Sequence, residues 1–183
     1  IELFHKDNYN TSIQLSKNGK TLYFLKQRTD LPAEIFSQST DGKNTLKRIT
    51  FTNEEILSQL EMNPVETFWC EGANGDKVQT VLVKPPFFDP NKKYPMMFLI
   101  HGGPQGAWED NFHYRWNLQM FAGAGYVVVA PNPRGSTGYG QKFTDEISGD
   151  WGGKVYTDLM NSYDYALNNF SYIDPKNTFA SGA

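Results

Sequence analysis

Residues 94–104 read YPMMFLIHGGP, an apolar strand that runs directly into a His-Gly-Gly-Pro loop. A second buried strand and a glycine-rich loop follow at residues 125–140, which read GYVVVAPNPRGSTGYG. A helix is expected near residues 116–124, and residues 156–169 carry apolar side chains at helical spacing before a last strand at 178–181. Apolar strands that alternate with amphipathic helices indicate a parallel α/β sheet covered on both faces.

The first 50 residues have a different pattern, with short alternating runs separated by turn residues. The runs are residues 12–15, 21–25, 34–38 and 46–50. Turn residues at 17–20 and 40–44 separate them and predict a small antiparallel sheet. Four short strands with tight turns are the content of one β-propeller blade, which needs neighbouring blades to bury its faces.

A polar connector is expected at residues 51–64, in which Asn53 would cap a short helix that runs as far as Leu60. Residues 65–83 then form two runs of strand residues on either side of Asn74-Gly75. Because Asn-Gly is a strong hairpin signal, these runs are predicted to pair.

The composition of the 183 residues, with 39% hydrophobic and 20% charged, favours a packed globular protein. A net charge of −3 gives no basic surface for nucleic acid or an anionic membrane, so neither partner is expected. The single Cys70 and three scattered histidines show no metal-ligand spacing, so no metal is expected and Cys70 is interpreted as a buried strand residue. No apolar run is long enough to span a membrane.

The last residues, 177–183, read NTFASGA and resemble the approach to a nucleophile elbow. In a G-x-S-x-G elbow that contains Gly182 and Ala183, the serine would come directly after Ala183. In α/β-hydrolases the acid and the base follow the serine in sequence, so no catalytic triad residue is expected within this chain. Two further serines are therefore interpreted as structural: Ser181 as part of the strand, and Ser136 as part of a loop near the mouth of the site.

The three histidines, His5, His101 and His113, are accordingly poor candidates for the general base. The ring of His101 is expected to fix the loop that it begins. Glu54-Glu55 is interpreted as the first turn of the connector helix rather than as a site for a peptide amino group.

Gly103 is the residue of this chain that we expect to act in catalysis. The transition state of acyl transfer develops an oxyanion, and a rigid backbone N–H at that point supplies about 10²–10³ in rate. Gly102 and Pro104 would line the cleft beside it. The alternative is that the two glycines only permit the turn after the strand.

Four segments occur in an order that resembles the prolyl oligopeptidase family of serine peptidases, in its acylaminoacyl-peptidase and dipeptidyl-peptidase V-like branch. They are His101-Gly102-Gly103-Pro104, residues 134–140 (RGSTGYG), Trp151-Gly152-Gly153 and Ser181-Gly182-Ala183. The resemblance implies a β-propeller followed by an α/β-hydrolase domain. By that resemblance, residues 1–50 would be the terminal blade and 51–64 the connector. Residues 65–183 would be the first part of the hydrolase domain, through its nucleophile strand.

The resemblance implies a serine exopeptidase of the dipeptidyl-peptidase or acylaminoacyl-peptidase type, which hydrolyses short peptides through an acyl-enzyme without metal or cofactor. Its partners would be a short peptide and the remainder of its own polypeptide, and a homo-oligomer is left open. The 183 residues alone are expected to be inactive. Two alternatives remain: an esterase or lipase on the same hydrolase fold, and a non-catalytic relative that serves as a binding module.

Overall fold

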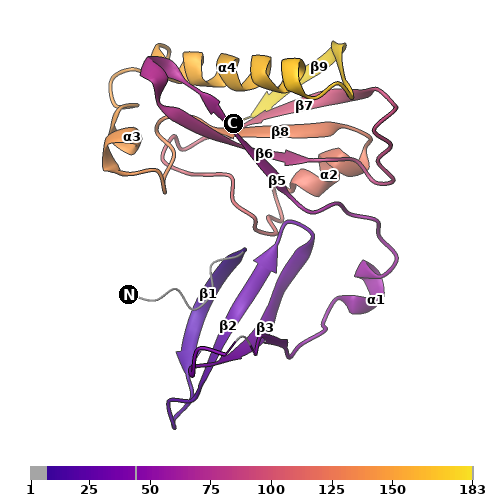
Figure 1. Ribbon diagram of the computed structural model, residues 1–183, viewed down its shortest axis with the longest axis vertical. Helices are drawn as coiled ribbons and strands as arrows, with labels where there is room; N and C mark the ends of the chain where they lie inside the picture. The colour runs from indigo at the N-terminus through magenta and orange to yellow at the C-terminus, as the bar shows by residue number, and fades with distance from the viewer. Residues whose placement is uncertain (1–7, 44, 183) are drawn as a thin grey trace. The chain divides into compact units, whose positions relative to one another are not determined.

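The computed structural model describes residues 8–43 and 45–182, and the chain divides into two compact units. The first unit contains the residues up to Met62 together with the segment 109–117, and the second contains the others. Each unit is built on its own β-sheet, and Figure 1 labels β1, β2 and β3 in one and β5 to β9 in the other.

The first unit holds a four-stranded antiparallel sheet in the order β1-β2-β3-β4. The strands are β1 Tyr9–Leu15, β2 Thr21–Arg28, β3 Leu31–Ser39 and β4 Lys47–Arg48. Among the described residues this confirms the antiparallel sheet predicted for the first 50 positions. The strands β2 and β3 are longer than predicted because a two-residue turn at Thr29 and Asp30 joins them directly.

The two faces of this sheet differ in burial. Phe24 and Phe36 stack with ring centroids 6.4 Å apart and form a small core with Leu31. Their neighbours in the chain, Tyr23 and Ile35, point to the opposite face and are each 40% exposed. The second face therefore presents large apolar side chains to solvent.

The connector contains one short helix, α1 Glu54–Leu57, which ends before Leu60. The prediction that Asn53 caps it was wrong, since the Asn53 side chain makes no capping hydrogen bond. The Asn53 backbone, with φ −110° and ψ 14°, lacks the extended conformation that aims a capping side chain at the helix amides. Arg48 instead approaches Glu54 at 2.8 Å and ties the helix to the sheet.

The segment 109–117 packs with the first sheet although it lies between two strands of the second in sequence. Asp110 accepts hydrogen bonds from the amide and the hydroxyl of Thr29 at 2.8 and 2.9 Å. Gln27 accepts another from the amide of Phe112 at 3.2 Å. These contacts are made by single polar side chains. Such contacts leave no periodic pattern in the sequence, so the sequence could not predict them.

The second unit holds a five-stranded sheet in the order β5-β6-β8-β7-β9. The strands are β5 Glu66–Glu71, β6 Lys77–Val83, β7 Tyr94–Ile100, β8 Val127–Asn132 and β9 Ile173–Gly182. Strand β7 pairs in parallel with both β8 and β9, as the alternation of strands and helices predicted. Strands β5 and β6 form the predicted hairpin, which adds an antiparallel edge to the sheet. At its turn, Asn74 and Gly75 have φ of 59° and 79°, the positive values that an Asn-Gly turn provides.

Helices cover both faces of this sheet, also as predicted (Figure 1). Helix α4, Lys154–Asn169, buries Ala166 against one face, and helix α2, Leu118–Gly123, buries Leu118 and Ala122 against the other. A further short helix, α3 Gln141–Asp145, follows the glycine-rich loop and was not foreseen. Cys70 is 4% exposed in β5, as its interpretation as a buried strand residue requires.

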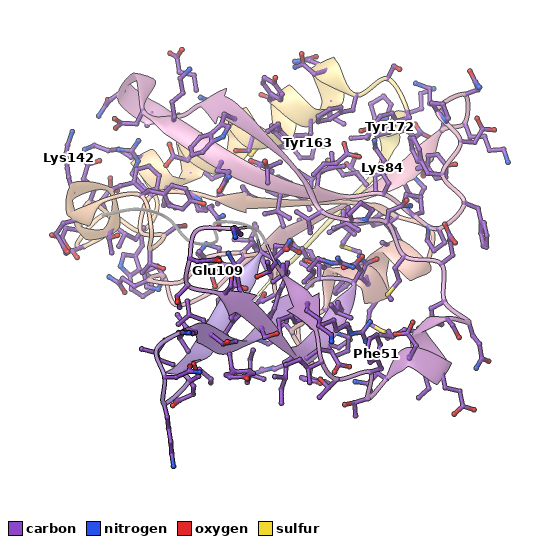
Figure 2. The ribbon with its side chains drawn as sticks, turned by 60° about the horizontal axis from the view of Figure 1, so that its bottom comes forward. Phe51, Lys84, Glu109, Lys142, Tyr163 and Tyr172 are labelled. Atoms are coloured by element: carbon purple, nitrogen blue, oxygen red, sulfur yellow. The ribbon has the colours of Figure 1, made fainter. Side chains whose placement is uncertain are left out.

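Side-chain contacts lie at two places along the approach to and the course of β9. The ammonium group of Lys84 lies 5.6 Å from the centre of the Tyr172 ring, and Figure 2 shows the two side chains close together. Burial raises the pKa of the Tyr172 phenol to about 12. Further along β9, the hydroxyl groups of Tyr163 in α4 and Thr178 lie 2.8 Å apart. Helix α4 therefore helps to fix the direction in which β9 approaches its carboxyl end.

Candidate active site

The carboxyl ends of β7 and β9 lie side by side, because Ile100 pairs with Gly182 in their parallel ladder. The loop that begins at His101 leaves β7 at this point. In α/β sheets the carboxyl ends of the strands are where ligands bind. The predicted loop residues and the predicted elbow glycine thus meet at one edge of the sheet, while Ala183 and His5 lie outside the described residues.

Gly103 has a backbone conformation that a larger residue would not tolerate. Its φ is 135°, and a β-carbon at this position would lie 2.9 Å from the backbone nitrogen of Gln105. The Gly103 N–H donates no hydrogen bond to any residue in the ranges 8–43 and 45–182. The turn therefore needs glycine here, and it leaves the amide proton available to a ligand.

A pocket of about 450 Å³ opens beside this amide. Gly102, Gly103 and Pro104 all line it, together with the aromatic side chains of Trp151 and Tyr156. The other lining residues are Ile100, His101, Ile147, Gly152, Val155 and Leu159. The lining is largely apolar.

The His101 ring fixes the loop, as the sequence analysis expected. Its Nδ1 lies 3.0 Å from the carbonyl oxygen of Gly102, and its Nε2 lies 2.9 Å from the hydroxyl oxygen of Ser136. The Trp108 ring packs against it edge to face at 6.1 Å. Both ring nitrogens are therefore engaged by neighbouring protein atoms, which leaves neither for a substrate.

Protons are scarce around His101. The Ser136 hydroxyl also lies 2.6 Å from the carbonyl oxygen of Pro133, which can only accept. A neutral imidazole and the hydroxyl together have two protons for three contacts, whereas an imidazolium and the hydroxyl together have three. Burial lowers the pKa of His101, and the hydrogen bond to Gly102 acts in the opposite direction.

Ser136 is fully buried, so its hydroxyl is a structural group and not an accessible nucleophile. Next to it, the amide of Thr137 donates to the carbonyl oxygen of Gly106 at 2.9 Å. Two contacts, His101 to Ser136 and Thr137 to Gly106, thus join the loop after β7 to the glycine-rich loop after β8. The other serine considered, Ser181, lies in β9 opposite Leu99.

Asn132, at the end of β8, clamps the same loop further along. Its side chain accepts from the Trp108 amide at 2.7 Å and donates to the Trp108 carbonyl at 3.0 Å. Asn132 is fully buried. Sequence reasoning missed this residue, although a polar residue at the end of an apolar strand is a signal that it could have used.

The glycine-rich loop is itself anchored by a buried ion pair that the sequence did not reveal. Arg134 is 1% exposed, and its Nε lies 2.9 Å from a carboxylate oxygen of Asp158 in α4, which is also fully buried. Glu146 pairs with the same guanidinium. Burial by itself lowers the pKa of Arg134, but the hydrogen bonds and charges of Asp158 and Glu146 raise it, so the group stays charged.

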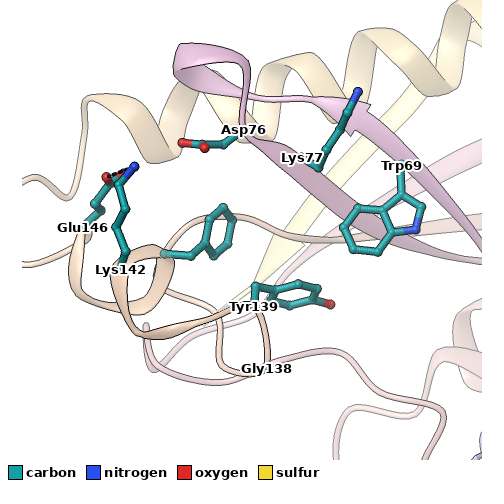
Figure 3. A pocket seen from close by; sticks show the side chains of 8 residues that line it. Trp69, Asp76, Lys77, Gly138, Tyr139, Lys142 and Glu146 are labelled. Carbon is teal, nitrogen blue, oxygen red and sulfur yellow. Dashed lines mark ion pairs between the residues drawn. The ribbon is translucent and has the colours of Figure 1, made fainter. Parts of the chain in front are cut away.

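A second pocket, of about 470 Å³, is lined by residues of β5 and β6 and of the segment 138–146 (Figure 3). Trp69, Tyr139 and Phe143 contribute aromatic surface to it. The Nζ of Lys142 lies 3.7 Å from Oε1 of Glu146, and a dashed line in Figure 3 marks this ion pair. The lining of this second pocket includes none of the predicted site residues Gly102, Gly103 and Pro104.

In the described part of the chain, no group of three or more His, Cys, Asp or Glu side chains is placed to hold a metal ion. No helix formed by those residues is long and apolar enough to cross a membrane.

Comparison with known proteins places this arrangement in a family. A model of the prolyl oligopeptidase family matches residues 112–183. The chain is 48% identical over 151 residues, 81% of its length, to a probable dipeptidyl-peptidase 5 of Arthroderma benhamiae. It is 46% identical over 151 residues, again 81% of its length, to dipeptidyl-peptidase 5 of Arthroderma otae. The chain belongs to the prolyl oligopeptidase family.

The fold agrees with this membership. The acylaminoacyl peptidase of Pyrococcus horikoshii superposes on 97% of the chain with a TM-score of 0.82 at 24% identity, and the match covers 27% of that protein. The chain also spans only 20% of the length of each of the two dipeptidyl-peptidases. The chain thus corresponds to about a fifth of the length of these two dipeptidyl-peptidases.

Proposed function

We propose that the whole protein is a serine exopeptidase of the dipeptidyl-peptidase or acylaminoacyl-peptidase type, which cleaves short peptides through an acyl-enzyme. The similarity to proteins named dipeptidyl-peptidase 5 supports the peptidase class. In this proposal the attacking serine follows Ala183, and the acid and the base lie further along the polypeptide.

The observation that carries the proposal is the free Gly103 amide. It lies on the loop that follows β7, at the edge of the sheet where β9 also ends, and it lines the pocket there. When a serine oxygen attacks a carbonyl carbon, the carbonyl oxygen becomes an oxyanion. The Gly103 N–H would donate to that oxygen, while Gly102 and Pro104 shape the cleft beside it.

We further propose that residues 1–50 are the terminal blade of a β-propeller, that 51–64 are the connector, and that 65–183 are the first part of an α/β-hydrolase domain. Four antiparallel strands with one open apolar face, on which Tyr23 and Ile35 are each 40% exposed, suit a blade that packs against a neighbour. A propeller would restrict access to the site, so short peptides should be cleaved and folded proteins should not.

The test uses the full-length protein with three substrates: an unblocked dipeptidyl anilide, an N-acetylated amino-acid anilide and a short-chain ester. We expect hydrolysis of one or both anilides, with loss of activity after stoichiometric labelling by a fluorophosphonate. Hydrolysis of the ester alone would favour the esterase alternative. Failure to hydrolyse any of the three or to react with the fluorophosphonate would favour a non-catalytic relative.

The proposed role of Gly103 as oxyanion donor is tested by Gly103→Ala, because the added β-carbon must strain or move the loop. We expect kcat to fall by about 10²–10³, the contribution of one oxyanion donor. Gly123→Ala is the matched control, because its β-carbon would meet no atom within 4 Å. Equal kcat values for the two variants would contradict the role assigned to Gly103.

A further inference from the structure

The carbonyl group that His101 contacts and the amide proposed to bind the oxyanion belong to the same peptide unit. That unit joins Gly102 to Gly103: its oxygen lies 3.0 Å from Nδ1 of His101, and its N–H is the free donor. The carbonyl and the N–H of a planar trans peptide point in opposite directions. A ring that holds the oxygen therefore fixes the direction of the N–H.

The ring is itself held from its other side. Nε2 lies 2.9 Å from the hydroxyl of Ser136, which is fully buried and lies 2.6 Å from the carbonyl oxygen of Pro133. The edge of Trp108 limits rotation of the ring as well. Few orientations of the imidazole satisfy all of these contacts.

We propose that His101 is the positioning residue for the oxyanion donor: its Nδ1–H holds the Gly102 carbonyl and thereby aims the Gly103 N–H into the pocket. This inference rests on the proposed function of Gly103. The hydrogen bond fixes the plane of the peptide unit before substrate binds, so no reorganisation is needed as the oxyanion forms. It also polarises the unit, because a bond accepted by a carbonyl strengthens the donor on the same peptide.

A purely structural role makes a different prediction. If His101 only tethers two loops, the essential contact is the one from Nε2 to Ser136, and the contact to Gly102 is incidental. The two contacts can be separated, since an asparagine amide occupies about the position of Nδ1 and a glutamine amide occupies about that of Nε2. His101→Asn thus keeps the donor to Gly102, and His101→Gln keeps the link to Ser136.

The experiment measures kcat and KM of the full-length protein and of both variants on a dipeptidyl anilide. We expect His101→Gln to lower kcat at least tenfold, part of the ~10²–10³ that one oxyanion donor supplies, with little change in KM. His101→Asn should stay within a few-fold of the wild type. The opposite order, or equal kcat values in the two variants, would overturn the proposal.

A second readout is specific to the oxyanion. A peptide boronic acid forms a tetrahedral adduct with the nucleophile, whereas the product dipeptide does not. Affinity for the boronic acid should fall in His101→Gln in proportion to kcat/KM, and affinity for the product should not change. Equal losses for the two ligands would indicate general damage to the site and would contradict positioning.

Ser136→Ala keeps the proposal testable if His101→Gln does not fold, because it releases the ring without removing it. We expect a lower kcat with unchanged KM, and a weaker affinity for the boronic acid with an unchanged affinity for the product, while Ser58→Ala, which removes an exposed hydroxyl, should match the wild type. Unchanged kcat in Ser136→Ala would count against the proposal. A wild-type protein without peptidase activity would refute the proposed function and this inference together, whereas an active wild type with the wrong order of variants would refute only the inference.

Discussion

Gly182 lies opposite Ile100 at a separation that leaves no room for a side chain. A β-carbon on residue 182 would come within 2.3 Å of the carbonyl oxygen of Ile100. That oxygen is part of the backbone, so it cannot turn away as a flexible side chain could. The close approach lets β9 end beside the loop that carries Gly103.

Gly182→Ala should therefore destabilise the protein. Overpacking against a fixed neighbour costs about 1–3 kcal/mol, because strand and backbone must shift together. Thermal unfolding of the full-length variant is expected to show a lower Tm than Gly123→Ala, where space is open. A Tm for Gly182→Ala equal to that of the control would mean that β9 does not approach β7 as described.

Removing one partner of the buried pair of Arg134 and Asp158 should lower the free energy of unfolding strongly, and the exposed Lys142 nearby offers a control. Asp158→Ala leaves the buried guanidinium without its main partner and should cost about 3–5 kcal/mol of unfolding free energy. Lys142, whose side chain is 82% exposed, pairs with the Glu146 carboxylate that also pairs with Arg134. Lys142→Ala should change stability by less than about 1 kcal/mol. Denaturant unfolding of both variants makes the comparison, and similar losses would contradict the description of Arg134 as the anchor.

The sequence predicted the elements that have a strong period or a strong turn signal. The apolar run before His101, the Asn74-Gly75 hairpin and helix α4 all lie close to their expected positions. Their local pattern and their tertiary environment favour the same structure, so pattern alone was sufficient.

Elements that depend on contacts made only in the folded chain could not be predicted. Strand β9 begins at Ile173, well before Thr178, because Ile173 already pairs with Tyr94 of β7; the register then shifts, and pairing resumes at Thr178 opposite Met96. The buried partnership of Arg134 with Asp158 joins residues 24 positions apart, and no spacing rule connects them. At the candidate site, the sequence pattern predicted the glycines. It did not predict the contact between Nδ1 of His101 and the Gly102 carbonyl, which only the folded structure shows.

Lowering the pH should destabilise the wild type more than His101→Asn. Burial holds the pKa of folded His101 below the value of about 6.5 of an unfolded chain, so the unfolded state binds more protons in that interval. The stabilisation is present above about pH 6.5 and is lost as the pH falls through the lowered pKa. The decrease in Tm from about pH 7.5 to about pH 5 is expected to be larger for the wild type. An equal or larger decrease in the variant would contradict this sign.

Cys70 should be almost unreactive in the folded protein. Burial raises the pKa of its thiol, and its sulfur lies 3.2 Å from the hydroxyl oxygen of Ser162. Alkylation depends on the thiolate and on access, and both are suppressed here. Peptide mass spectrometry after iodoacetamide treatment at about pH 8 should show Cys70 modified only when denaturant is present, since a free thiol has a pKa of about 8.5. Rapid native alkylation would show that β5 is open at this point.

The role of Gly103 is tested most directly by a crystal structure of the full-length protein with a peptide boronic acid bound to its nucleophile. The boronate oxygen that occupies the oxyanion position should lie 2.7–3.1 Å from the backbone nitrogen of Gly103, within the range of such donors at about ideal geometry. His101 Nδ1 should remain in contact with the Gly102 carbonyl, as at 3.0 Å in the free chain. A boronate oxygen held by other donors, with the Gly103 amide turned away from it, would contradict the account.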